Sequence, residues 1–231
     1  MILLAADTSG KHGSIALARV TDDAKPGNGS PDALEILEIV PLAGGTFSAQ
    51  LVPQIATLLS KHGLQVHDIG AFAAASGPGS FTGLRVGLAA IKALAEVLQK
   101  PIAAVSLLEV VARSANVQGR ILAVLDAGRG EAYAGDYEVG DRVKLHSERL
   151  LSRDELLSEA ATRVFVTPHA SIAEATRKAG LHPIEIPEPR SDAIARFGWE
   201  KMQAGQTVSP EDLEANYIRR SDAEIFAKNS S

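Results

Sequence analysis

The stretch ILLAADTSGKHGSIALARV at residues 2–20 decides the fold, because it returns later in the chain as ILAVLDAGRGEAYAGDYEV at residues 121–139. In each copy an apolar run ends in an aspartate, a turn of small residues follows, and a second run of apolar and small side chains begins. This pattern is typical of a β-hairpin. Asp7 and Asp126 hold the same place in the two copies. The repeat predicts two related halves, and its period is too long for a solenoid.

Strands and helices alternate after each hairpin. Residues 48–61 and 84–98 have helical spacing, and residues 69–76 form a short apolar run expected to be a buried strand. The pattern predicts a two-lobed α/β fold of the kind seen in actin, Hsp70 and the sugar kinases, with an N-terminal lobe at 1–110 and a C-terminal lobe at 111–231. In that architecture a nucleotide lies between the lobes. A last helix is expected from Ser191, as its N-cap, to Gly205.

The composition limits the function. The chain has 231 residues, a formal net charge of -5, and 45% apolar and 22% charged side chains, as in ordinary globular proteins. An acidic chain is not expected to bind nucleic acid alone, although it fits a subunit whose partner holds the nucleic acid. The absence of cysteine excludes disulfides and thiolate zinc sites and is consistent with a cytoplasmic protein. The N-terminal apolar run ends at Asp7, too early for a signal or membrane segment.

A glycine-rich loop precedes the second predicted helix in SGPGSFTGLRVGLAAIKAL, residues 76–94. Backbone N–H groups at such a helix start can bind phosphate, and Ser80 or Thr82 can cap the helix. Neither the P-loop nor the dinucleotide signature is complete, so a tight strand-to-helix connection is the favoured alternative. The residues expected at a nucleotide or phosphate site are Asp7, Thr8, Ser9, Gly77, Gly79, Ser80, Thr82, Gly83 and Asp126.

The two aspartates at the strand ends have two interpretations. They can hold Mg²⁺ through water or orient an attacking water, or they can form Asx turns. The six histidines show no metal-binding spacing, and GPGSF at residues 77–81 misses the nucleophile-elbow pattern by one place. We therefore expect no histidine metal site and no serine nucleophile.

The predicted helices at 48–61 and 84–98 are apolar on more than one side. The second has only Arg85, Lys92 and Glu96 as clearly polar positions, and many of its other residues are alanine or glycine. A helix that is apolar nearly all round is buried on more than one side. Small residues allow another helix to approach closely, so the pattern favours a helical dimer interface.

Four motifs in order resemble the bacterial TsaB (YeaZ) family: ILLAADTS, SGPGSFTGLRVGLAAIKALA, LDAGRGEAY and ANYIRRSDAE. The resemblance spans residues 2 to about 224. It implies an actin-like fold and a required, non-catalytic role in making N6-threonylcarbamoyladenosine in tRNA. The larger paralogue TsaD would carry the metal and catalyse the transfer, an ATPase, TsaE, would join the complex, and tRNA would bind through the complex.

The resemblance also implies where the TsaD partner binds. By motif order the residues expected at the partner surface are Leu51, Val52, Ile55 and Leu59 in the first helix, and Arg85, Val86, Ala89, Ala90, Ala93 and Val97 in the second. The same helices could form a homodimer. No cofactor is expected to be required, although weak ATP or ADP binding fits the ancestral fold. An independent actin-like ATPase or kinase is the alternative function.

The chain departs from the family pattern at three places. Phe47 precedes Ser48 where many members have histidine, a departure that we expect to change packing at the partner surface. The second hairpin reads Asp126-Ala127-Gly128 with Arg129 one place late, so a phosphate contact from that arginine is not expected to carry over. Residues 25–33, KPGNGSPDA, have the composition of a loop insertion.

Overall fold

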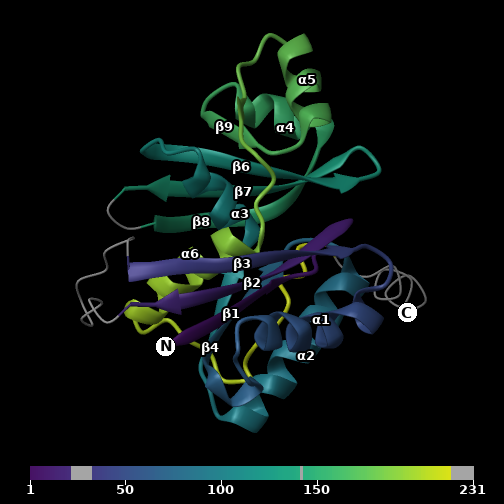
Figure 1. The fold of residues 1–231 in the computed structure, drawn as a ribbon. Coiled ribbons are helices and arrows are strands. Elements are labelled where there is room, and N and C mark those ends of the chain that lie inside the picture. Colours follow the sequence, from purple (N-terminus) through teal and green to yellow (C-terminus); the bar gives the residue numbers. More distant parts are fainter. Residues whose placement is uncertain (22–32, 141–142, 220–231) are drawn as a thin grey trace, which may run out of the picture. The chain divides into compact units, whose positions relative to one another are not determined.

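The computed structural model describes residues 1–21, 33–140 and 143–219, and the chain forms two compact units (Figure 1). The first unit comprises residues 1–106 and 190–216, and the second comprises residues 107–189 with the described residues 217–219. Each unit is built on one five-stranded sheet. The expected insertion at 25–33, except its last residue, and the part of the ANYIRRSDAE motif after Arg219 lie outside the described residues.

Among its described residues the first unit contains five strands, two α-helices and one 3₁₀ turn between them, and one helix from late in the chain. In chain order its elements are β1 (Ile2–Asp7), β2 (His12–Val20), β3 (Leu34–Ala43), α1 (Phe47–Lys61), the 3₁₀ turn η2 (Val66–Asp68), β4 (Ile69–Gly77), α2 (Phe81–Leu98), β5 (Ile102–Ser106) and α6 (Ser191–Gln203).

The second unit repeats this plan. Its elements are α3 (Leu107–Ser114), β6 (Gly119–Gly128), β7 (Glu131–Val139), β8 (Val143–Ser152), α4 (Arg153–Ala160), β9 (Val164–Thr167), α5 (Ala170–Lys178) and β10 (Ile184–Glu185).

The two sheets have the same topology. The strand orders are β3-β2-β1-β4-β5 and β8-β7-β6-β9-β10. In both, the first three strands along the chain pair antiparallel, and the last two run parallel to the first. The duplication predicted from the two hairpins is therefore confirmed.

The helices α1 and α2 cover one face of the first sheet and α6 covers the other. Alternate side chains of β4 point to opposite faces. Phe72 and Ala74 join the core cluster that includes residues of α1 and α2. On the other face an ideal Cβ at Gly198 of α6 would lie 2.5 Å from the Cβ of Ala73, so α6 packs directly on the small side chains of β4.

The unit boundaries differ from the expected division at residue 110. The helix α3, which follows β5 in the chain, packs on β6, β7 and β9 of the second unit. The helix α6, which follows β10, packs on the first sheet. The first unit thus ends at residue 106 and regains residues 190–216, because each sheet needs a helix on its second face.

The last helix begins at Ser191, the residue that the sequence predicted to precede it as the N-cap. Arg190 is the N-cap of α6, and its backbone is extended. The backbone N–H of Ser191 donates to Oγ of Ser14 in β2, at 2.9 Å. The prediction of Ser191 as the N-cap is therefore wrong, because Ser191 is already the first residue of the helix.

Over the described ranges, no helix combines the length and apolar character needed to cross a membrane.

Because α6 lies so close to β4 at Gly198, we predict that even one added methyl group at this position does not fit. Gly198→Ala should lower the free energy of unfolding by about 1–3 kcal/mol through overpacking, although alanine favours a helix over glycine by about 1 kcal/mol. Urea unfolding followed by circular dichroism measures the change. Gly140→Ala is the matched control, because a Cβ there meets no atom within 4 Å. Equal stability of the two variants would contradict the packing argument.

Candidate functional site

Two loops that the sequence singled out meet at one edge of the first sheet. The Asp7-Thr8-Ser9 turn follows β1, and the glycine-rich loop follows β4, its parallel neighbour. The hydroxyl Oγ1 of Thr8 donates to the carbonyl oxygen of Gly83 at 2.7 Å. The backbone N–H of Ser80 donates to the carbonyl oxygen of Ser9 at 2.6 Å. The structure therefore brings together Asp7, Thr8, Ser9, Gly77, Gly79, Ser80, Thr82 and Gly83, all within the first unit.

The glycines of this loop are explained by close packing against the turn. An ideal Cβ at Gly79 would lie 2.5 Å from the carbonyl oxygen of Ser9. A Cβ at Gly83 would overlap the carbonyl oxygen of Thr8, and one at Gly87 would overlap its hydroxyl. These positions exclude any side chain, which is what a tight strand-to-helix connection requires.

The loop also uses its own backbone donors. Ser80 is the N-cap of α2, as expected, and its hydroxyl accepts a hydrogen bond from the N–H of Gly83 at 3.2 Å. The N–H of Leu84 donates to the carbonyl oxygen of Ser80 at 2.8 Å. The other capping candidate, Thr82, is exposed. The amides of Ser80 and Gly83 thus bond to protein oxygens, which favours the tight connection over the phosphate site.

The two aspartates form the same kind of turn in the two units. Oδ1 of Asp7 accepts from the N–H of Ser9 at 2.9 Å and from its hydroxyl at 2.6 Å. Oδ1 of Asp126 accepts from the N–H of Gly128 at 2.8 Å. Asp7 is buried and Asp126 is exposed. Both side chains therefore make Asx turns. Among the described residues no group of three histidine, aspartate or glutamate side chains lies close enough to hold a metal.

Sequence reasoning gave no role to Arg219, although it lies in the ANYIRRSDAE motif. Its Nη1 donates to the carbonyl oxygen of Ala127 at 2.9 Å, and its guanidinium pairs with Glu131. It also lies 6.0 Å from the ring centroid of Tyr133. The turn it holds has three successive residues at positive φ, with the non-glycine Arg129 at 58°. Arg219 therefore stabilises the β6–β7 turn, which follows Asp126 in the chain.

The outer face of α2 carries the expected partner residues. Arg85, Ala89, Ala93 and Val97 are exposed and follow one another at intervals of four, so they form one stripe along the helix, with Val97 81% exposed. Val86 and Ala90 beside the stripe are half-buried. The guanidinium of Arg85 stacks on the ring of Phe81, 3.7 Å from its centroid, at the start of the stripe.

On α1 the structure contradicts most of the predicted partner surface. Val52 is 55% exposed and remains a surface residue. Leu51, Ile55 and Leu59 are at most 3% exposed and belong to the core of the first unit. Their assignment to the partner surface is wrong, because this stripe of α1 faces the sheet and cannot also face a partner.

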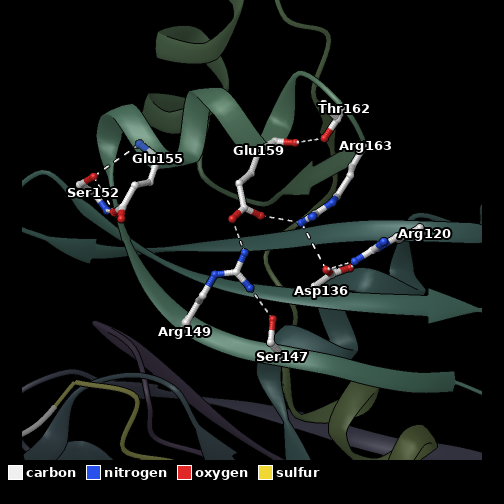
Figure 2. Close-up of polar contacts among 9 residues, drawn as sticks. All are labelled: Arg120, Asp136, Ser147, Arg149, Ser152, Glu155, Glu159, Thr162 and Arg163. Atoms are coloured by element: carbon white, nitrogen blue, oxygen red, sulfur yellow. Dashed lines mark hydrogen bonds and ion pairs between the residues drawn. The ribbon is translucent and has the colours of Figure 1, made fainter.

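A second concentration of charge lies in the second unit and links four of its elements (Figure 2). Asp136 of β7 is buried and accepts from Nε and Nη2 of Arg120 at 3.0 and 2.8 Å. Arg163 pairs with Asp136 at 3.3 Å and with Glu159 of α4 at 2.5 Å. Glu159 also pairs with Arg149 of β8. The hydrogen bond from Arg120 lowers the pKa of Asp136, helped by the charge of Arg163, while burial opposes the shift.

In this network two carboxylates pair with three arginines and tie α4 to the sheet. Every carboxylate oxygen of Asp136 and Glu159 faces an arginine. The arrangement stabilises the second unit and leaves no converging set of groups for chemistry.

Comparison with known proteins gives these features a family context. The family model described as TsaD, tRNA N6-adenosine threonylcarbamoyltransferase, matches residues 39–204. The tRNA threonylcarbamoyladenosine biosynthesis protein TsaB of Escherichia coli is 27% identical over 187 residues, which cover 75% of this chain and 81% of that protein. The protein of the same name from Bacillus subtilis is 34% identical over 139 residues, covering 60% and 56%.

A solved structure agrees with the fold. YeaZ from Pseudomonas aeruginosa matches with a TM-score of 0.72 and 24% identity, over 94% of this chain and 99% of that one. The actin-like α/β fold class expected from the duplicated hairpins is confirmed.

The charge network predicts a stability that depends on pH. Because the pKa of Asp136 is lower in the folded chain than its usual value of 3.8, its contribution is fully present above about pH 5 and is lost as the pH falls through the lowered pKa. Asp136→Asn should lower the free energy of unfolding at pH 7 by about 1–3 kcal/mol. The difference from the wild type should shrink below about pH 4. Urea unfolding at pH 7, 4 and 3 tests this.

Glu138→Gln is the control for this prediction. Glu138 lies on the same strand but is exposed. Its replacement should change stability by less than about 0.5 kcal/mol. A difference between Asp136→Asn and the wild type that stays constant down to pH 3 would count against the assigned role of the carboxylate.

Proposed function

The chain belongs to the TsaD family, and within it to the TsaB (YeaZ) proteins, and from this we propose that it is a required, non-catalytic subunit in the synthesis of N6-threonylcarbamoyladenosine in tRNA. It binds and activates a larger TsaD-like transferase. A TsaE-like ATPase joins the complex, and tRNA is bound through the complex. The observation that carries the proposal is the exposed stripe of small and apolar residues on α2.

The chemistry of the stripe suits a helix of another protein. Ala89 and Ala93 present only methyl groups, so a second helix can approach the backbone closely, and Val97 adds exposed apolar area that contact would bury. Val52 is also exposed and apolar, and it lies on α1, the helix that packs beside α2. Arg85, held on the ring of Phe81, offers a pre-oriented donor at one end of the stripe. A homodimer through the same surface is the form we propose when the partner is absent.

The loops at the sheet edge support a subunit rather than an enzyme. Asp7 and Asp126 bond to their own turns, and the glycine-rich loop bonds to the turn after β1. These groups perform structural work in an arrangement where related folds place phosphate ligands. Any binding of ATP or ADP would have to displace such contacts, and we propose that it is weak and not required.

The first test is reconstitution with the TsaD-like and TsaE-like proteins of the same organism, threonylcarbamoyl-adenylate, ATP and unmodified tRNA. Ala93→Glu should weaken binding of the TsaD-like protein by about 100-fold, because the carboxylate would be buried against apolar groups without a partner. Modified adenosine, measured by mass spectrometry, should fall with it. Calorimetry of the two purified proteins gives the affinity.

The matched control is Ala170→Glu, an exposed alanine at the start of α5 in the second unit. This variant should bind and support modification as the wild type does. Normal pairing by a folded Ala93→Glu protein would exclude the mapped surface. Full modification by the TsaD-like protein without this chain would reject the proposed function.

An independent actin-like ATPase or kinase is the second candidate, favoured by the aspartate at the end of the first strand in each duplicated unit. We expect no ATP hydrolysis above background in the presence of Mg²⁺, and no difference between the wild type and Asp7→Asn. Release of inorganic phosphate over hours provides the measurement. Turnover that both Asp7→Asn and Asp126→Asn abolish would support the enzyme and contradict the subunit.

A further inference from the structure

We propose that Thr8 is a positioning residue that holds the N-terminal half of α2 and so sets the geometry of the stripe on its outer face. The positioning of the helix follows from the first unit alone. Its consequence for partner binding rests on the proposed function.

The contact of Thr8 with α2 is buried and specific. Thr8 is only 3% exposed. Its hydroxyl donates to the carbonyl oxygen of Gly83 in the first turn of α2, at 2.7 Å. A carbonyl oxygen has two lone pairs, so it can accept this bond in addition to the one within the helix. The turn after β1 is therefore bonded to the helix backbone itself, and not to a mobile side chain.

Close packing at this contact prevents α2 from moving nearer to the turn after β1. Gly83 and Gly87 stand one helical turn apart, and both face Thr8 with no space for a Cβ. Packed interiors transmit small displacements because they have no free volume to absorb them. A change of the Thr8 side chain must therefore move α2 or open the contact.

Hydrogen bonds within the turn and to the glycine-rich loop hold the turn that carries Thr8. Asp7 accepts two hydrogen bonds from Ser9, and the carbonyl oxygen of Ser9 accepts the N–H of Ser80 just before α2. Two separate hydrogen bonds, one on each side of the helix start, thus fix α2 to the end of β1.

The first part of the outer stripe lies within or next to the helical turns that make this contact. Arg85 falls between Gly83 and Gly87 in the sequence, and Ala89 follows two residues after Gly87; both are exposed, whereas the glycines are buried. A tilt or shift of α2 at Thr8 would displace these surface residues by a similar amount. Contacts between close-packed helices are sensitive to such displacements.

The experiment compares Thr8→Val, which keeps the shape but removes the hydroxyl, with Thr8→Ser, which keeps the hydroxyl. The first readout is hydrogen exchange, measured by mass spectrometry on the isolated chain. Thr8→Val should raise exchange about tenfold in residues 83–90, while residues 51–59 of α1 exchange as in the wild type. Thr8→Ser should restore slow exchange in the segment.

The second readout is the affinity for the TsaD-like protein. We expect Thr8→Val to weaken binding by about five- to tenfold and Thr8→Ser to bind within twofold of the wild type. At a limiting concentration of the chain, tRNA modification should fall for Thr8→Val and stay near the wild-type level for Thr8→Ser.

Gly87→Ala provides a second variant if Thr8→Val does not fold. The new methyl group would overlap the Thr8 hydroxyl and separate it from Gly83, while alanine itself favours the helix. It should produce the same rise in exchange and the same loss of affinity as Thr8→Val.

Three results would overturn the proposal. If residues 83–90 exchange as slowly in Thr8→Val as in the wild type, the Thr8 hydroxyl does not position α2. Faster exchange spread evenly over the first unit would mean general destabilisation. Faster exchange confined to residues 83–90, with unchanged affinity for the TsaD-like protein, would mean that the Thr8 contact does not influence the outer stripe. If the wild-type chain does not bind the TsaD-like protein at all, the proposed function fails, and the exchange measurement still decides whether Thr8 positions α2.

Discussion

A five-stranded sheet with apolar side chains on both faces must be covered on both faces, and this requirement governs the arrangement of the chain. Each duplicated half supplies two helices between its strands, which cover one face of its own sheet. The second face of the first sheet is covered by α6, from the end of the second half, and α3 packs on the second sheet. Small residues at the contact, such as Gly198 over Ala73, allow α6 to lie close to β4. The units are discontinuous in sequence because of this requirement.

The glycine-rich loop illustrates how one sequence pattern serves two physical purposes. Glycines near a helix start allow backbone amides to surround a phosphate, and they equally allow a helix to lie directly on another backbone. In this chain the loop and α2 pack on the Asp7-Thr8-Ser9 turn, and the amides of Ser80, Gly83 and Leu84 bond to protein oxygens. The incomplete phosphate-binding signatures agree with this use. Local motif spacing alone could not separate the two purposes, since both need the same residue type.

The two hairpin turns are stabilised by different means although they occupy equivalent places. In the first, Asp7, Thr8 and Ser9 are buried beneath the glycine-rich loop. The second is exposed, and the guanidinium of Arg219 holds it through the carbonyl oxygen of Ala127 and the carboxylate of Glu131. Charged contacts also tie α4 to the second sheet through Asp136 and Glu159 (Figure 2). In the first unit α1 and α2 instead pack on their sheet through a large apolar cluster.

The sequence by itself determined the duplicated hairpins, the α/β class and the places of most helices, because these follow from apolar periodicity and turn residues that are local in the chain. It did not indicate the strand β8, whose side chains are mostly polar or half-exposed and show no clear alternation. It assigned Leu51, Ile55 and Leu59 to a surface, because periodicity shows that a helix has apolar stripes and does not show which stripe meets the sheet. Only the tertiary structure decided the return of α6 to the first unit, the contact of Thr8 with Gly83 and the contacts of Arg219, since each joins residues more than 70 positions apart.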